Sequence, residues 1–366
     1  MTEQCDTSPV RIALDAMGSD NAPDTDVAGA VRASLKTDIE IILVGDEALL
    51  QEKLDGYPKK GNISIRHAPQ VIGMHEQPVL AVRKKRQSSL HVAMRLVKEG
   101  EAHGVVSAGN TGAVMVASRT VLGSIHGVAR AALSQTFPTM QGEVVLLDMG
   151  ANVDCTARQL CEFAEMGVAY SHYALGVEEP RVGLLNIGEE GGKGGAVMRE
   201  VYHTLSATNH INFVGNVEPR ALFEGKADVV VCDGFIGNLF LKTSEAAASF
   251  MGKMLREYFE SSSMSKIGAV LARKALGQMR DRVDPNEKPG APLLGINGTV
   301  MCQHGSCSAR GIENAIYGTR VAIENNLNEH IYNNIMKLRQ AEAGAESSDA
   351  GVQDHTESEV AHKAAQ

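Results

Sequence analysis

The stretch Gly104-Val-Val-Ser-Ala-Gly-Asn-Thr-Gly112 joins a short apolar run to a glycine-rich loop, and a helical pattern follows directly. Three later stretches repeat this arrangement: Val144-Val-Leu-Leu-Asp-Met-Gly-Ala-Asn-Val-Asp154, Val182-Gly-Leu-Leu-Asn-Ile-Gly-Glu-Glu-Gly-Gly-Lys-Gly-Gly195 and Asp228-Val-Val-Val-Cys-Asp-Gly-Phe-Ile-Gly-Asn238. In an open parallel sheet, ligands bind beyond the carboxyl ends of the strands. Glycine lets backbone N–H groups approach an anion, and the start of the next helix adds positive charge. Four such loops in one chain predict a site for an anionic small molecule.

Apolar runs rich in β-branched residues alternate with longer helical patterns along most of the chain. The expected strands are Arg11–Leu14, Glu40–Val44, Ile63–Arg66, Gly104–Ser107, Val144–Leu147, Val182–Asn186, Asn212–Gly215 and Asp228–Cys232. The expected helices include Val79–Lys98, Thr111–Leu122, Gln159–Leu175 and Gly195–Ser206. This alternation predicts an α/β fold with three α/β/α layers and a mostly parallel sheet. We expect the four loops, together with a first loop around Asp15, to meet at one edge of that sheet.

The domain organisation is predicted to be simple. Residues 10–335 contain no linker rich in Pro, Gly or Ser and are expected to form a single α/β unit, whereas residues 1–9 and 340–366 are expected to be disordered. Residues 236–282 break the α/β rhythm and predict a protruding helical hairpin. Its second helix places Ile267, Val270 and Leu271 at roughly helical spacing among basic residues. This stripe is explained either by packing on the subunit or a dimer partner, or by contact with an anionic membrane surface.

Composition and missing motifs exclude several classes of function. A net charge of −9 argues against general affinity for nucleic acid. No apolar run approaches the roughly 20 residues that span a bilayer, and the first residues have no signal-peptide core, so we expect a cytoplasmic protein. The six cysteines show no metal-like spacing. No dinucleotide fingerprint, complete P-loop or serine-hydrolase elbow occurs. We therefore expect no cofactor and no metal.

Several polar residues in and near these loops are candidates for the site. Lys193 lies among glycines, where its ammonium group would meet a phosphate unless it is simply a solvated loop lysine. His304 follows another glycine-rich stretch and suits proton transfer or oxyanion binding, although single histidines are often structural. The remaining candidates can equally serve as helix caps or turn residues; they are Asp15, Gly109, Asn110, Thr111, Asp148, Gly150, Asn152, Gly188, Asp233, Gly234, Asn238 and Asn297.

The densest positive patch of this acidic chain is the run Arg83, Lys84, Lys85 and Arg86. Within the expected helix Val79–Lys98, this run is either a solvated face or a docking site for an acidic partner.

Six motifs, taken together, resemble one known family. They are Asp15-Ala-Met-Gly18, Gly109-Asn-Thr-Gly112, Asp148-Met-Gly-Ala-Asn152, Leu185-Asn-Ile-Gly-Glu-Glu190, Asp233-Gly-Phe-Ile-Gly-Asn238 and Gly290-Ala-Pro-Leu-Leu-Gly295. From about Val10 to Ile335, the chain is similar to the phosphate acyltransferase family of bacterial phospholipid synthesis, known as PlsX. Ser19 and Asn21 replace the usual Gly and His, and Gly191 replaces a common third Glu. Because of these departures, a role for the side chains of the first loop does not follow from the resemblance.

The resemblance implies an acyltransferase that converts acyl-[acyl carrier protein] and inorganic phosphate into acyl phosphate and free carrier protein. It also implies a homodimer with a fold like those of isopropylmalate dehydrogenase and phosphotransacetylase, in the cytoplasm and at the membrane surface. A membrane-bound glycerol-3-phosphate acyltransferase would use the product. The run Arg83–Arg86 would then dock the carrier protein, and Ile267, Val270 and Leu271 would contact the membrane.

Phosphate is a dianion near neutral pH, so the expected chemistry depends on positioning and on stabilising the tetrahedral oxyanion. We expect the glycine loops and Lys193 to hold the phosphate, and His304, Asn152 or Asn238 to stabilise the oxyanion. Three alternatives stay open from the sequence. They are thiol-dependent acyl transfer through Cys302 or Cys232, an NAD-dependent decarboxylating dehydrogenase of related fold, and a non-enzymatic scaffold that binds acyl carrier protein.

Overall fold

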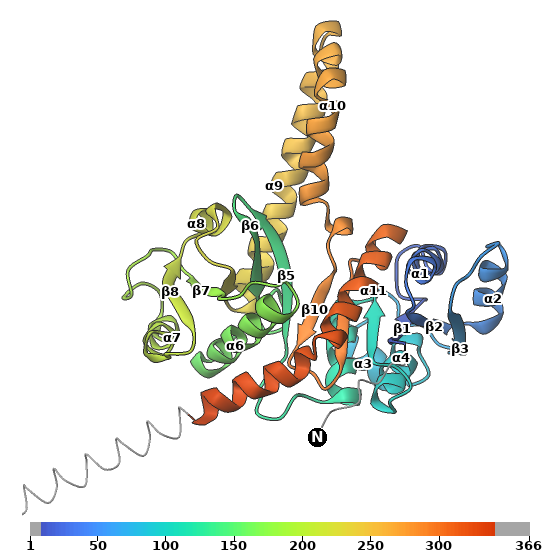
Figure 1. Ribbon diagram of the computed structural model, residues 1–366, viewed down its shortest axis with the longest axis horizontal. Helices are drawn as coiled ribbons and strands as arrows, with labels where there is room; N and C mark the ends of the chain where they lie inside the picture. The colour runs from blue at the N-terminus through green and yellow to red at the C-terminus, as the bar shows by residue number, and fades with distance from the viewer. Residues whose placement is uncertain (1–8, 341–366) are drawn as a thin grey trace, which may run out of the picture.

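The computed structural model describes residues 9–340 (Figure 1). The ends that were predicted to be disordered, apart from residues 9 and 340, lie outside the described residues. The strands are β1 (Arg11–Asp15), β2 (Glu40–Gly45), β3 (Ile63–His67), β4 (Gly104–Ser107), β5 (Ala132–Thr139), β6 (Gly142–Leu147), β7 (Arg181–Leu185), β8 (Asn212–Val217), β9 (Val229–Val231), β10 (Ala291–Leu294) and β11 (Thr299–Cys302). The α-helices are α1 (Asp24–Lys36), α2 (Glu47–Asp55), α3 (Pro78–Lys84), α4 (Ser89–Lys98), α5 (Thr111–Ala117), α6 (Ala157–Tyr173), α7 (Ala196–Ala207), α8 (Pro219–Glu224), α9 (Gly234–Glu260), α10 (Ser263–Val283) and α11 (Ala309–Glu324). A π-helical turn η1 (Ser118–Leu122) extends α5, a 3-10 turn η2 (Pro285–Glu287) follows α10, and residues 327–340 are also helical.

All the strands named above belong to one sheet, in the order β3-β2-β1-β4-β11-β10-β5-β6-β9-β7-β8. The five strands from β3 to β11 are parallel to one another, and so are the four from β6 to β8. Between these halves, β10 and β5 pair only in antiparallel fashion. The two parallel halves therefore run in opposite directions. Because the carboxyl ends of the two halves point to opposite edges, the expectation of one shared sheet edge is wrong. Loops after β1, β4 and β6 nevertheless line one cavity, which is described below.

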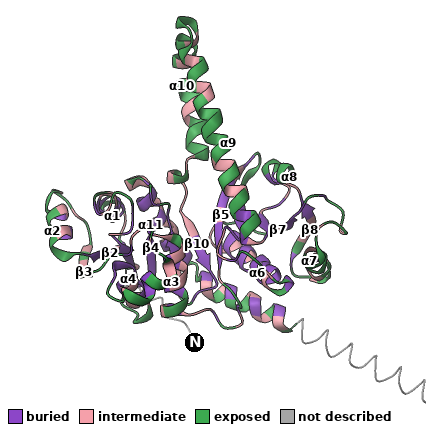
Figure 2. Ribbon diagram, turned by 180° about the vertical axis from the view of Figure 1, so that it is seen from behind, coloured by how far each residue is buried: buried purple, intermediate pink, exposed green. Residues whose placement is uncertain are grey.

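Helices cover both faces of the sheet because successive strand residues point to opposite sides. In the first half, Ile12 and Leu14 pack with α1 and α11, whereas Ala13 packs with α4 and α5 on the other face. That second core continues across the middle of the sheet to the first turns of α9. In the other half, Val145 and Leu147 pack against α6. The predicted three-layer α/β/α fold is confirmed, with buried strands between helices (Figure 2).

The predicted hairpin is formed by α9 and α10, which project together from the body of the molecule (Figures 1 and 2). Ser262 caps α10 by accepting a hydrogen bond from the Ser265 amide at 3.1 Å. Val270 and Leu271 are 72% and 83% exposed. Among residues 9–340, no helix is long and apolar enough to cross a membrane.

The secondary structure differs from the prediction in two places. The single helix expected at Val79–Lys98 is divided into α3 and α4, because the Ser88 hydroxyl accepts a hydrogen bond from the His91 amide and starts a new helix. Strands β5, β10 and β11 were not expected. They are hidden in sequence because β10 and β11 are only four residues long, β10 lies between glycines, and β5 contains a proline.

Candidate active site

Two adjoining cavities lie where the two halves of the sheet meet. The first, here called the polar cavity, measures about 580 Å³ and is lined mainly by loops. The second, the apolar cavity, measures about 900 Å³ and is lined by β5, α8, α9 and the loop after β7. Gln135, Leu241, Glu245, Pro285 and Lys288 line both cavities and are here called the shared wall. The two cavities therefore adjoin along this wall.

Helix α9 separates the two cavities. Asn238, Lys242 and Glu245 line the polar cavity, and their spacing places them on one face of the helix. Phe240 and Ala247 line the apolar cavity, and they lie on the opposite face because each residue advances the helix by about 100°. The base of α9 therefore presents polar groups to one cavity and apolar groups to the other.

The loop before α5 forms one side of the polar cavity, through Gly109, Asn110, Thr111 and Gly112. The Asn110 Oδ1 accepts a hydrogen bond from the Ala113 amide at 3.1 Å and so caps α5. Its Nδ2 donates to the carbonyls of Met74 and Glu76 at 2.9 and 3.0 Å. The Asn110 side chain is therefore committed to building the loop. What the loop offers a ligand is the set of first-turn amides, which have no partner within a helix.

The turn after β6 forms a second side and depends on Asp148. This buried carboxylate accepts hydrogen bonds from the amides of Leu133, Ala151 and Asn152 at 3.0, 3.1 and 2.6 Å, and from the Asn152 side chain at 2.9 Å. Burial raises the pKa of Asp148, and these hydrogen bonds act against that rise. Neither Asp148 nor Asn152 lines the polar or the apolar cavity. Together they hold Gly150, which does line the polar cavity, against Asn238.

The start of α9 packs tightly on this turn. A Cβ atom added to Gly237 would lie 1.8 Å from the Asp148 carbonyl oxygen, which leaves no room for a side chain. One added to Gly234 would lie 2.6 Å from the Asn152 carbonyl oxygen. The two glycines in this stretch thus allow the helix and the turn to meet backbone to backbone.

The end of β11 supplies a third side, with Cys302, Gln303 and His304. The His304 Nδ1 lies 2.8 Å from the Ser306 hydroxyl, and its amide donates to the Gln303 side chain at 3.0 Å. These contacts hold the imidazole ring at the cavity. The Cys302 thiol is buried, and burial raises its pKa to about 12. Because a thiol with such a pKa is protonated at neutral pH, it is a poor nucleophile.

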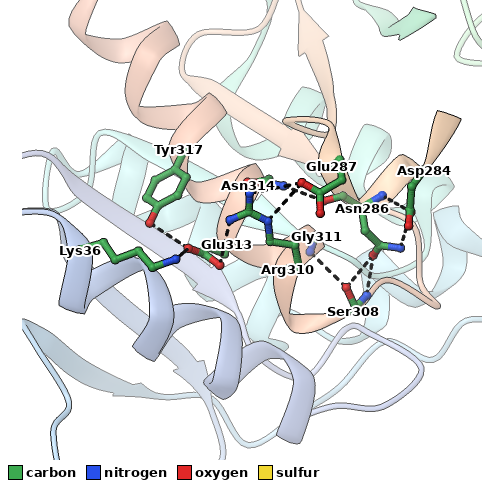
Figure 3. Close-up of polar contacts among 10 residues, drawn as sticks. All are labelled: Lys36, Asp284, Asn286, Glu287, Ser308, Arg310, Gly311, Glu313, Asn314 and Tyr317. Atoms are coloured by element: carbon green, nitrogen blue, oxygen red, sulfur yellow. Dashed lines mark hydrogen bonds and ion pairs between the residues drawn. The ribbon is translucent and has the colours of Figure 1, made fainter. Parts of the chain in front are cut away.

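The shared wall is fixed by the segment that links α10 to β10. Asn286 accepts hydrogen bonds from the amide and hydroxyl of Ser308 at 2.7 and 2.9 Å, and its carbonyl accepts one from Asn314 at 2.7 Å. Glu287 pairs with Arg310 of α11 at 3.2 Å (Figure 3). Lys288 follows directly and forms an ion pair with Glu143. The lysine stem is thus held in the wall between the cavities.

Several predicted site residues lie outside both linings. The Lys193 ammonium group is 3.7 Å from Glu190, although Gly194 and Gly195 beside it line the apolar cavity. Asp233 caps α9 by accepting from the Ile236 amide at 2.8 Å, and Asn297 donates to the Ser124 carbonyl at 2.8 Å. Asp15 is buried and accepts a hydrogen bond from the Ser107 hydroxyl at 2.8 Å. Gly188 and Gly234 are also absent from the linings.

Six of the predicted site residues do line the polar cavity together. They are Gly109, Asn110, Thr111, Gly150, Asn238 and His304.

Comparison with known proteins agrees with the pattern of motifs. A family model described as "Fatty acid synthesis protein" matches residues 10–330. The phosphate acyltransferase of Trichlorobacter lovleyi is 48% identical over 308 residues, which is 84% of this chain and 89% of that protein. That of Desulforamulus reducens is 49% identical over 319 residues, covering 87% and 95%. The chain belongs to the phosphate acyltransferase family.

The fold of this phosphate acyltransferase family member is also found in solved structures. A phosphotransacetylase from Streptococcus pyogenes covers 86% of this chain and 94% of its own, with a TM-score of 0.58 and 18% identity. The EutD phosphotransacetylase from Staphylococcus aureus covers the same shares with a TM-score of 0.55 and 18% identity. At this level of identity the likeness concerns the fold.

One departure from the phosphate acyltransferase motifs has a structural explanation. The hydroxyl of Ser19 donates a hydrogen bond to the buried Asp26 carboxylate at 2.6 Å. Burial raises the pKa of Asp26 to about 7, and the Ser19 hydrogen bond acts against that rise. The serine hydroxyl therefore serves one oxygen of a buried acid of α1.

Sequence reasoning missed four charged residues of the polar cavity in this phosphate acyltransferase family member. They are Asp20, Lys242, Glu245 and Lys288. Lys242 and Glu245 pair at 3.0 Å on α9. Asp20 follows the motif Asp15–Gly18, and Lys288 precedes the motif Gly290–Gly295. Their closeness to these motifs could have identified them as candidates. Lys242 and Glu245 lie within a long helix, and no local pattern distinguishes them. Among residues 9–340, no group of three or more His, Cys, Asp or Glu side chains is placed to hold a metal ion.

Proposed function

We propose that this protein transfers a fatty acyl group from acyl-[acyl carrier protein] to inorganic phosphate and releases acyl phosphate and free carrier protein. The observation that carries the proposal is the pair of cavities joined at the shared wall, one polar and the other apolar. Membership of the phosphate acyltransferase family supports the same reaction.

In the proposed reaction, a phosphate oxygen attacks the thioester carbonyl carbon. A carbon–oxygen bond forms, the carbon–sulfur bond breaks, and the proton of the phosphate passes to the departing thiolate. Both reactants must be held in line, and the oxyanion of the tetrahedral intermediate must be stabilised. No protein nucleophile is needed. The covalent alternative is disfavoured because burial raises the pKa of both the Cys302 and Cys232 thiols.

The phosphate is proposed to lie in the polar cavity, near the start of α5 and between Lys242 and Lys288. Backbone amides at the first turn of a helix and lysine ammonium groups both bind phosphate oxygens. Lys193 stays a candidate for this role, although its loop borders the apolar cavity. His304 and Asn238 are proposed to face the thioester. His304 is suited to carry the proton to the leaving sulfur, and the Asn238 amide is suited to donate a hydrogen bond to the oxyanion.

The carrier protein is proposed to dock at the carboxyl end of α3. Arg83, Lys84 and Arg86 are exposed there, whereas Lys85 is paired with Glu76 at 2.5 Å. The other end of α3 lies at the cavity, because a Cβ atom on Gly112 would be 2.7 Å from the Pro78 ring. A helix of this length spans about 10 Å, so an acidic carrier on the basic end would lie close to the polar cavity.

The outer hairpin is proposed to contact the cytoplasmic membrane surface through Ile267, Val270 and Leu271. A polar face with lysines and arginines beside exposed apolar residues is typical of such contacts. A peripheral position would deliver acyl phosphate to a membrane-bound glycerol-3-phosphate acyltransferase. A homodimer is also proposed, and packing of α9 or α10 against a second copy is the alternative use of the same apolar residues.

The decisive experiment measures free thiol released from purified acyl-[acyl carrier protein] with and without inorganic phosphate. We expect release to require both enzyme and phosphate, and to be matched by formation of acyl phosphate. Thiol release that is independent of phosphate would indicate a hydrolase. No release at any phosphate concentration would favour a binding scaffold.

A further inference from the structure

We propose that the apolar cavity binds the hydrocarbon chain of the acyl group and that Ala247 of α9 sets the limit on chain length. The proposal rests on the proposed function for the identity of the head group. The chain site itself is argued from the lining of the apolar cavity and can be tested without turnover.

The lining of the apolar cavity is mostly apolar, with an aromatic group of three phenylalanines. The Phe240 ring packs against two other lining rings, with its centroid 5.4 Å from that of Phe137 and 5.5 Å from that of Phe223. Phe223, Ile236 and Leu239 also line the cavity, and they are 39%, 39% and 58% exposed. Grouped apolar side chains that stay accessible around a concave site are typical of a binding site for an apolar ligand.

The position of the apolar cavity identifies which ligand it takes. It adjoins the polar cavity along the shared wall, where Gln135, Glu245 and Lys288 offer polar groups between the two. A ligand with an apolar chain and a polar reactive end satisfies both sides. The acyl carbonyl would then lie at the shared wall, with the phosphate on one side of α9 and the chain on the other.

Small residues on α9 extend the apolar cavity beyond Phe240. Ser244, Ala247 and Ala248 continue the same lining toward Val283 of α10. At Ala247 a large side chain would occupy the space that the distal methylenes need. Ala246 is next in the chain but does not line the cavity, and it is exposed. The two alanines therefore form a matched pair on one helix.

The first test compares Ala247→Trp with Ala246→Trp, using palmitoyl- and octanoyl-carrier protein as substrates. We expect Ala247→Trp to lower kcat/KM for the palmitoyl substrate by about tenfold or more, because several methylenes lose their contacts, and to leave the octanoyl substrate nearly unaffected. Ala246→Trp should leave the ratio of the two unchanged. An unchanged ratio in Ala247→Trp, with normal folding by circular dichroism, would overturn the proposal.

The second test measures binding without carrier protein or phosphate. Because the chain contains no tryptophan, Phe240→Trp introduces a single indole at the cavity, and Phe250→Trp introduces one on the exposed hairpin outside it. Palmitate should give a saturable blue shift in Phe240→Trp only, and octanoate should bind more weakly. The same shift on raising protein concentration without palmitate would show that a second copy covers the cavity, which contradicts the proposal. Palmitate binding without phosphate-dependent thiol release would refute the proposed function and retain the chain site.

Discussion

The base of α9, residues 234–248, and its outer half, residues 249–260, belong to one continuous helix but obey different constraints. At the base, Gly237 lies against a backbone oxygen with no space for a Cβ atom, whereas Gly252 in the outer half has nothing within 4 Å. The base lines two cavities, and the outer half exposes Phe250 and Tyr258 to solvent. The difference shows that an uninterrupted helical pattern in the sequence does not indicate which part of a helix lines a site. The close approach of neighbouring backbone, seen at Gly237, does indicate it.

The sharpest way to break this comparison is to add one methyl group to each region. Gly237→Ala should cost more than about 3 kcal/mol of folding free energy, because α9 or the Asp148 turn must move. Gly252→Ala should stabilise the protein by about 1 kcal/mol or less, since alanine is the better helix former. Urea unfolding of both variants measures the contrast. Equal effects would mean that the base of α9 is not tightly seated.

The next effect concerns the turn on which the base of α9 rests. Asp148→Asn should lose about 2 kcal/mol of stability, because the amide cannot accept all the hydrogen bonds that the buried carboxylate accepts. Turnover should fall with it as Gly150 and Asn238 lose their alignment. Asp154→Asn, at an exposed position in the same loop, should change stability by less than about 0.5 kcal/mol. Thermal unfolding and thiol release are the measurements.

The charges at the base of α9 and in the shared wall should act on phosphate, and those of the hairpin should not. Lys288→Ala is expected to raise the KM for phosphate about tenfold, through loss of a charge-assisted hydrogen bond. Lys266→Ala, on α10, is the control and should leave that KM unchanged. Lys193→Ala tests the loop after β7. If it raises the KM for phosphate and Lys288→Ala does not, the phosphate lies beside that loop.

The smallest effect on turnover is expected at the outer end of the hairpin. The double substitution Val270→Glu and Leu271→Glu should remove binding to vesicles that contain anionic lipid, since two exposed apolar contacts become negative charges. Activity on soluble acyl-carrier protein should stay within about twofold of the unmodified enzyme. Vesicle sedimentation measures the first and thiol release the second. A large loss of activity would mean that the hairpin contributes to catalysis or to a required dimer.

The fold was largely predictable, because parallel strands are continuous apolar runs and α9 and α10 are long helical patterns. The central strands were not, since β10 is four residues between glycines and its pairing depends on distant partners. The loops at Gly109 and Gly150 were recognisable because glycine marks where backbone approaches a site. Lys193 was predicted because it lies among glycines. Lys242 and Glu245 lie within a helix, where no local sequence pattern marks a site. The apolar cavity is also invisible in sequence, because its phenylalanines come from β5, α8 and α9.

The anchoring of Asn286 to Ser308 and Asn314 has a mechanical consequence. It fixes the direction in which the chain leaves α10 and enters the body, while α9 enters the same hairpin as one unbroken helix. The hairpin is therefore held at both of its roots and behaves as a rigid spacer. From residue 249 to residue 260 the helix rises about 18 Å. A surface in contact with the outer end of the hairpin is thus kept at a fixed distance from the cavities, and the length of the outer half of α9 sets that distance.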